Sequence, residues 1–429
     1  MRAIFGRCGS GSVLPLISSH AVTRGDLIWK SDAAGNLTCY NYDALHRVTI
    51  SSYGGPYQPS TPTRYYVYDS ATVDSALMAN GGGRLVEAYT TTGSGKITDL
   101  GFSYTARGEV SDTYEMTPHS GGYFHLSATY FWNGQLKTFS PAGTPMLTYN
   151  VDGEGRPLTI TASSGQNPVT STAYNTASQV TSVSYGSGDS DSFSFDPNTQ
   201  LPLGYKINVG TKAQTATISQ NANHTMRQLS ITDTIFGNEN QTCVFTYDEF
   251  SRVTKDSCGS AWGAAYAYDL FGNMAKSTIA GSPGTSFQPT YNIANHFATI
   301  PGGTPSYDSN GNLLNDSFHQ YTWDNESNPV TVDGNPITYD ALNRRVEYYN
   351  SSVGYVQYLW APYDVTRNLV IESSSGAQVQ LPLPGGGQAM VGPSGVTDYR
   401  HSNWQGSQVI DSTPSQTAAV VRAGPACSG

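Results

Sequence analysis

Tyr307-Asp308-Ser309-Asn310-Gly311-Asn312-Leu313 is the stretch that decides the fold of this 429-residue chain. The same frame returns as Tyr339-Asp340-Ala341-Leu342-Asn343-Arg344-Arg345, where Tyr-Asp is again followed by three residues and then by Asn or Arg. Three more clean copies share this frame: Tyr42-Asp43 with Arg47, Tyr247-Asp248 with Arg252, and Tyr268-Asp269 with Asn273. The motif is therefore an internal repeat, the first feature to establish in any sequence.

The spacing of the copies supports a repeat. When degenerate copies are included, starts fall at residues 104, 130, 151, 174, 195, 222, 247, 268 and 291, in steps of 21 to 27 residues. The step then shortens to 16 residues through 307, 323 and 339. Chance matches would not keep such a rhythm.

Each repeat has the size and chemistry of a β-hairpin. An Asp at a strand end accepts hydrogen bonds from the N–H groups of the following turn, and Gly or Asn suits a turn position with positive φ. The Tyr offers a large apolar face with a polar tip for stacking on the next repeat. A single hairpin is marginally stable, so the repeats must stack. We expect a long antiparallel sheet that coils on itself.

Composition agrees and excludes several classes of protein. Only 13% of residues are charged, which excludes a coiled coil or a charged helix bundle, and 29 tyrosines favour strands. The net charge of −10 argues against nucleic acid as a partner. No apolar stretch is long enough to span a membrane, and no signal peptide is visible at the N-terminus.

The chain resembles the RHS/YD-repeat family, bacterial relatives of the teneurin shell. The resemblance is densest over residues 291–360, and Tyr399-Arg400-His401-Ser402-Asn403-Trp404-Gln405-Gly406-Ser407 is similar to a late element of the family, with Asn403 and Gln405 in place of the usual acid and Leu. It implies an all-β fold whose antiparallel YD-repeat strands spiral into a curved, incomplete, hollow β-shell.

The resemblance also implies function and partners. In the family, the shell encloses a C-terminal, often toxin-like region, and a core with DPxG-like motifs plugs it and cuts the chain. No DPxG follows Trp404, so self-cleavage and a toxin do not carry over. We expect a non-enzymatic shell segment, or a cell-surface scaffold, that is secreted or on the cell surface. Its partners would be the missing RHS core and the toxin-like tail.

Three segments are expected along the chain. Residues 1–30 are irregular, residues 31–380 form the YD-repeat β-shell, and residues 381–429 lead towards the missing core. No Pro/Gly-rich linker separates independent domains. A shell that ends before its plug has an open rim, so the region after Leu381 should be the least well packed.

No catalytic, cofactor or metal site is expected. The repeated Asp residues are explained by turn formation, and Asp308 to Asn312 fails as a calcium loop because Leu313 stands where Gly is required. No G-x-S-x-G, Walker A or H-E-x-x-H motif occurs. The alternative function is carbohydrate binding or adhesion, with glycans or cell-surface proteins as partners. Its candidate aromatics are Tyr65, Tyr66, Tyr68, Tyr123, Trp132, Trp323 and Trp360.

Two of the five cysteines are expected to pair. A hairpin whose turn is centred between Phe250 and Ser251 places residues opposite each other when their numbers sum to 501, as those of Cys243 and Cys258 do. A disulfide between them would close a loop of about 15 residues, which is worth roughly 3 kcal/mol. Cys8, Cys39 and Cys427 have no comparable partner.

Overall fold

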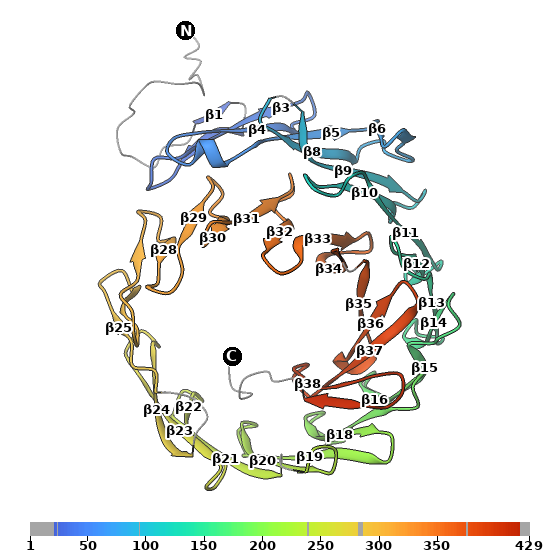
Figure 1. Cartoon of the computed structure of the whole chain (residues 1–429), viewed down its shortest axis with the longest axis vertical. Helices are drawn as coiled ribbons and strands as arrows, with labels where there is room; N and C mark the ends of the chain where they lie inside the picture. Colours follow the sequence, from blue (N-terminus) through green and yellow to red (C-terminus); the bar gives the residue numbers. More distant parts are fainter. Residues whose placement is uncertain are drawn as a thin grey trace. The chain divides into compact units, whose positions relative to one another are not determined.

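The computed structural model describes residues 21–23, 25–93, 95–237, 240–281, 286–374 and 376–420. Across them the chain forms 39 strands and two 3₁₀ helices of three residues each, η1 (Gln58–Ser60) and η2 (Pro384–Gly386) (Figure 1). Every strand pairing recorded among these residues is antiparallel, as in the hairpin β3–β4, so the predicted all-β antiparallel fold is confirmed. Within the same ranges, no helix has the length and apolar character needed to cross a membrane.

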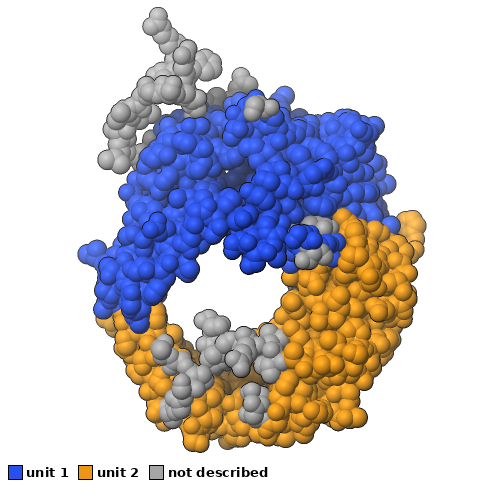
Figure 2. Space-filling model, viewed as in Figure 1, with its two compact units in different colours: residues 1–130, 290–377 blue, residues 131–289, 378–429 orange. Residues whose placement is uncertain are grey.

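The chain divides into two compact units that interleave along the sequence (Figure 2). Unit 1 contains residues 1–130 and 290–377, and unit 2 contains residues 131–289 and 378–429. Each unit therefore combines an earlier and a later part of the chain.

Unit 1 consists mainly of strands that pair with their sequence neighbours. One ladder runs from β1 to β11 and a second runs from β29 to β34, while β6–β7, β25–β26 and β27–β28 are separate hairpins. The strands are β1 (Ala21–Thr23), β2 (Asp26–Ser31), β3 (Leu37–Tyr42), β4 (Val48–Gly54), β5 (Thr63–Tyr68), β6 (Thr72–Val73), β7 (Ala76–Leu77), β8 (Leu85–Thr91), β9 (Lys96–Tyr104), β10 (Val110–Met116), β11 (Phe124–Tyr130), β25 (Thr290–Tyr291), β26 (Phe297–Thr299), β27 (Ser306–Tyr307), β28 (Leu313–Asn315), β29 (Tyr321–Trp323), β30 (Pro329–Val332), β31 (Asn335–Tyr339), β32 (Arg345–Asn350), β33 (Gly354–Ala361) and β34 (Asp364–Glu372).

Unit 2 follows the same rule. Strands β12 to β24 pair consecutively, and strands β35 to β39 form a second ladder. The strands are β12 (Leu136–Ser140), β13 (Leu147–Val151), β14 (Pro157–Ala162), β15 (Val169–Tyr174), β16 (Val180–Tyr185), β17 (Ser190–Phe195), β18 (Pro202–Val209), β19 (Lys212–Gln220), β20 (Met226–Asp233), β21 (Gln241–Tyr247), β22 (Val253–Ser257), β23 (Trp262–Tyr268), β24 (Met274–Gly281), β35 (Gln378–Pro382), β36 (Gln388–Gly392), β37 (Gly395–Ser402), β38 (Gln408–Ser412) and β39 (Ala418–Val420).

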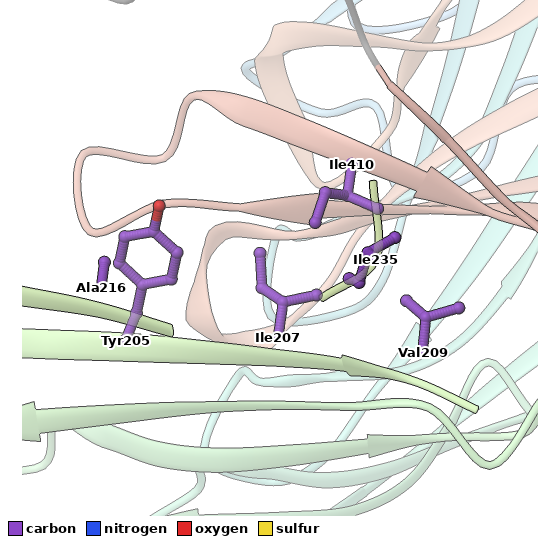
Figure 3. Close-up of a cluster of buried hydrophobic side chains, with 6 residues drawn as sticks. All are labelled: Tyr205, Ile207, Val209, Ala216, Ile235 and Ile410. Atoms are coloured by element: carbon purple, nitrogen blue, oxygen red, sulfur yellow. The ribbon is translucent and has the colours of Figure 1, made fainter. Parts of the chain in front are cut away.

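The core of unit 2 lies between its earlier and later strands. Tyr205, Ile207 and Val209 alternate along β18, so their side chains share one face of the sheet. Ile410 of β38 is fully buried against this face (Figure 3). The later ladder therefore forms a second layer over part of the earlier one.

Unit 1 has an equivalent arrangement. Ala88 of β8 and Leu100 and Phe102 of β9 form a buried cluster with Ala341, which lies in the β31–β32 turn. Here a turn, rather than a strand, supplies the covering residue.

The described residues from Leu381 to Val420 are well packed. Leu381, Ala389, Val391 and Ile410 are all 0% exposed, so the expectation that this region would be the least well packed is wrong. Its strands cover the apolar face of β18, and this burial stabilises them.

Candidate functional site

The predicted repeat residues build one recurring turn, which the Asp248 turn illustrates. The N–H groups of Phe250 and Arg252 donate to Asp248 Oδ1 at 3.0 and 2.9 Å, and Arg252 Nε donates to Asp248 Oδ2 at 2.7 Å. Ser251 has φ of 62° and donates its N–H to the Asp248 carbonyl oxygen. The Asp side chain thus holds both limbs of the turn together.

The other four clean copies have the same geometry. In each, Asp Oδ1 accepts the N–H four residues later at 2.8 to 3.0 Å, and the Arg or Asn side chain at that position donates to Oδ2. These pairs are Asp43 with Arg47, Asp269 with Asn273, Asp308 with Asn312 and Asp340 with Arg344.

These contacts lower the pKa of the turn carboxylates of Asp43, Asp248, Asp269 and Asp308. The main cause for Asp43 is the backbone N–H of Arg47. For Asp248, burial by itself would raise the pKa, but the N–H and guanidinium of Arg252 outweigh it. The carboxylates remain ionised and act as hydrogen-bond acceptors.

The Tyr of the motif links one repeat to the one before it. The hydroxyl of Tyr42 donates to the carbonyl oxygen of Leu27 at 2.8 Å, that of Tyr247 to Met226 at 2.7 Å, and that of Tyr268 to Val253 at 2.8 Å. The sequence predicted that the Tyr side chain stacks on the next repeat, but it did not predict this hydrogen bond of the hydroxyl group. The hydroxyl donates to a backbone carbonyl oxygen, which every residue has, so the sequence could not indicate this hydrogen bond.

The Arg of the motif makes the reciprocal link. The Arg252 guanidinium lies 4.4 Å from the ring centre of Tyr268, and Arg47 lies 4.4 Å from that of Tyr68. Arg344 makes the same contact with Trp360 at 5.1 Å. We call this connected series of contacts the Asp–Arg–Tyr ladder.

In unit 1 the three turns of the short 16-residue spacing contact other strands and turns. Asn310 Oδ1 accepts the N–H of Ala34 at 2.9 Å, and Asn325 Nδ2 donates to the Gly54 carbonyl oxygen at 2.8 Å. Ala341 joins the buried cluster of β8 and β9. These turns therefore dock on β3, β4 and their neighbours.

A buried polar network in unit 2 was not predicted. His401 Nδ1 lies 2.7 Å from Asp191 Oδ1, and His401 Nε2 lies 2.9 Å from Ser412 Oγ. Ser412 Oγ donates to Asp189 Oδ2 at 2.7 Å. All four residues are at most 1% exposed. The only sequence signal was that His401 falls in the late element of the family.

The network has the Ser-His-Asp order of a nucleophilic triad, but its proton arrangement differs. The single hydroxyl proton of Ser412 is given to Asp189, so His401 Nε2 must donate to Ser412 rather than accept from it. Burial also prevents a substrate from reaching Ser412. The network therefore clamps β37 and β38 onto β17 instead of activating a nucleophile.

Unit 1 buries a comparable acid. Glu115 Oε1 accepts the N–H of Trp360 at 3.1 Å, while Oε2 has no hydrogen-bond partner. Burial raises the pKa of Glu115 to about 7, although Arg344 and the Trp360 N–H oppose the shift.

Most of the candidate sugar-binding aromatics are used in packing. Tyr65 stacks on Tyr89, and the polar atoms of the other internal members donate to acceptors within the chain. These are Tyr66 to Ala341, Tyr68 to Val48, Tyr123 to Asp99, Trp323 to Leu313 and Trp360 to Arg345. Trp132 differs because it is 93% exposed. In the described ranges, no group of three or more His, Cys, Asp or Glu residues could hold a metal ion.

Cys243 and Cys258 form a disulfide with Cα atoms 4.0 Å apart. The register around it follows the sum of 501, as in Val244 opposite Ser257, although a bulge shifts Tyr247 opposite Val253. Cys39 is also disulfide-bonded, so the expectation that it lacks a partner is wrong. Cys8 and Cys427 lie outside the described residues.

Solved structures share this fold over most of the chain. TcdB2-TccC3-TEV and TcdB2-TccC3 without its hypervariable C-terminal region align with TM-scores of 0.72, at 15% and 14% identity, over 92% of this chain and 23% of theirs. The Photorhabdus luminescens Tc holotoxin pore aligns equally well, at 15% identity, over 92% of this chain and 22% of that one. This chain has the RHS/YD-repeat fold.

Sequence comparisons give shorter matches. The tRNA nuclease WapA of Bacillus subtilis strain 168 is 31% identical over 87 residues, which are 20% of this chain and 4% of WapA. The tRNA3(Ser)-specific nuclease WapA of Bacillus spizizenii is 30% identical over the same shares. No family model matches. The chain thus spans a small part of the proteins that it resembles.

Proposed function

We propose that this chain is a non-enzymatic wall segment of an RHS/YD-repeat shell, and that the shell encloses a C-terminal, toxin-like polypeptide. The observation that carries the proposal is the shared fold with TcdB2-TccC3 over 92% of the chain. One of those solved forms is described as lacking a hypervariable C-terminal region, which is the kind of segment that such a wall would enclose.

The Asp–Arg–Tyr ladder supports a wall function. Where the motif carries Arg, the turn is closed by its Asp and tied to the next repeat by the Arg and a Tyr, as Asp248, Arg252 and Tyr268 show. Repeated contacts of this kind hold neighbouring repeats together in a stiff sheet. The buried His401 network supports the same conclusion, since its hydroxyl is inaccessible.

Export fits this proposal. The family resemblance points to a secreted or cell-surface location, and disulfides such as Cys243–Cys258 persist in oxidising compartments.

Protease protection of an attached peptide tests the proposal. An unfolded reporter peptide with one protease site is fused after Gly429, and its cleavage rate is compared with that of the same peptide fused to an unrelated, compact carrier protein. We expect markedly slower cleavage on this chain, and no protection after the chain is unfolded in urea. Equal cleavage rates on the two carriers contradict encapsulation.

Glycan binding is a second candidate because Trp132 is 93% exposed. An exposed indole face can stack on a sugar ring. A glycan array probed with the wild-type chain and Trp132→Ala separates the two functions. Glycan binding that is lost in the variant supports adhesion, and an array without signal removes this candidate.

A further inference from the structure

Apolar residues stand at the tips of several Tyr-Asp turns. We call the two residues that follow the Asp of a turn its tip. Phe250 is 73% exposed, Leu270 101% and Phe271 80%. Large apolar side chains at this exposure keep an unfavourable free energy of hydration that burial would remove, so a neighbouring group of them indicates a contact surface.

These three residues form one patch. Phe250 is at the tip between β21 and β22, and Leu270 and Phe271 are at the tip between β23 and β24. The strands are antiparallel neighbours, so both tips lie at the same edge of the sheet, about 10 Å or two strand spacings apart. The hydrogen bond from Tyr268 to Val253 holds the two hairpins together.

Tips of this motif already act as docking elements in unit 1. The Ala341 tip is buried against Leu100 and Phe102, and the Asn310 and Asn325 tips bond to neighbouring backbone groups. The same turn geometry can therefore present its tip to a sheet surface, as these three turns do. The patch of Phe250, Leu270 and Phe271 lacks such a surface within the described part of its own unit.

Unit 2 also has an apolar pocket that is not filled by its own side chains. The pocket has a volume of about 180 Å³ and is lined by Val180, Phe193, Phe195, Pro202 and Trp404, together with two glycines. An apolar cavity of about 150 Å³ accommodates benzene, so this one has room for a phenyl ring. Its walls are aromatic and aliphatic, which suits an apolar side chain and not a charged one.

We propose that the tip patch of one molecule inserts into the Trp404 pocket of a second copy of this chain. The patch supplies phenyl and isobutyl groups, and the pocket supplies an apolar site of matching size. Because the two surfaces are different parts of one chain, the contact is heterologous, and a bound molecule still offers a free patch and a free pocket. The assembly is then open-ended.

Charged variants of each surface test the proposal. Phe250→Asp with Phe271→Asp places two charges in the patch, and Phe195→Glu charges the pocket. Phe195 lies on β17 outside the buried clusters, and Val180→Glu is a second pocket variant if Phe195→Glu unfolds the protein. Leu45→Asp, at a 69% exposed tip in unit 1, is the matched control. Thermal unfolding establishes that each variant is folded.

Sedimentation velocity over a range of concentrations gives the readout. We expect the wild type and Leu45→Asp to form larger species as concentration rises, and each surface variant to weaken association at least about tenfold. A mixture of patch variant and pocket variant should form one-to-one dimers that do not grow, since one functional contact remains.

Three results would overturn the proposal. A wild type that stays monomeric shows that the surfaces do not bind each other. Patch variants that assemble like the wild type indicate pairing through strand edges. Pocket variants that assemble like the wild type, without dimers in the mixture, indicate contact between patches.

Discussion

The aspartate of the motif closes the turn in every clean repeat, but its exposure to solvent differs between repeats. Asp340 is 0% exposed and Arg344 11%, because the Ala341 tip docks on β8 and β9. The side chain of Asp43 is 24% exposed with the same type of Arg partner. An ion pair removed from water leaves a costly unpaired charge when one partner is deleted, whereas an exposed partner is resolvated.

Substitution at these two positions should therefore have unequal effects. Asp340→Ala leaves the Arg344 guanidinium unpaired in a buried site, and we expect it to lower the free energy of unfolding by about 3–5 kcal/mol. Asp43→Ala is the control and should lower it much less, because Arg47 is more exposed than Arg344 and keeps Asp69 as a second partner. Urea unfolding followed by tyrosine fluorescence measures both. Equal losses would show that turn formation, and not burial, dominates.

Glu115 should make the stability of the protein depend on pH. Its folded pKa of about 7 lies above the ordinary value of 4.5, so the folded state binds the proton more tightly. Protonation of Glu115 therefore contributes to the free energy of unfolding. This contribution is complete below about pH 4.5 and is lost as pH rises through about 7, a change on the order of 3 kcal/mol.

Unfolding curves of the wild type and Glu115→Gln at pH 5 and pH 8 measure this contribution. We expect the stability gap between the two pH values to shrink in Glu115→Gln, and to stay unchanged in the exposed control Glu154→Gln. If the difference in stability between pH 5 and pH 8 is equal in all three proteins, the ionisation of Glu115 does not lower the stability of the folded state.

At the scale of elements, the ladder explains the repeat rhythm. Tyr68 follows Arg47 by 21 residues and Tyr268 follows Arg252 by 16, yet both Arg groups lie 4.4 Å from the ring centre. Strand length changes between repeats while the contact is kept. In the repeats that carry Arg, the Arg–Tyr contact is thus kept more closely than the number of residues between its two members.

The disulfide of the β21–β22 hairpin should stabilise this element. We expect Cys243→Ser with Cys258→Ser to lose about 3 kcal/mol, the value for closing a loop of about 15 residues. Because Cys39 is also disulfide-bonded, thiol titration of unfolded, unreduced protein should find one free thiol among the five cysteines. Five free thiols after purification from an oxidising compartment would refute both bonds.

At the scale of the whole molecule, the His401 network connects strands far apart in the sequence. His401 and Ser412 belong to the later ladder, and Asp191 belongs to β17, 210 residues earlier than His401. His401→Ala leaves the buried Asp191 Oδ1 and Ser412 Oγ without their shared imidazole partner, which should lower the free energy of unfolding by about 3 kcal/mol.

Hydrogen exchange should show where that loss occurs. In His401→Ala we expect faster exchange in β36 to β38, while β21 to β23 of the same unit keep their protection. Trp132→Ala, at an exposed position, is the control. Uniform acceleration throughout unit 2 would show that the later ladder and the earlier sheet unfold as one.

The sequence by itself determined the local structure of this protein. The motif specifies a hairpin turn through contacts within five residues, as Asp248 and Arg252 show. It consists of Tyr-Asp, a residue suited to positive φ, and then Arg or Asn. Such short-range hydrogen bonds leave a pattern that can be read along the chain. The pairing of each strand with its sequence neighbour follows from the repeat.

Only the tertiary structure decided which repeats are covered. His401 contacts Asp191, Ala341 packs on Leu100, and Ala389, Val391 and Ile410 are buried, and none of these contacts has a periodic signal in the sequence. They depend on how the later ladder of each unit lies on the earlier sheet. The physical reason is that side-chain alternation specifies which face of a strand is apolar, but not which distant strand will cover it.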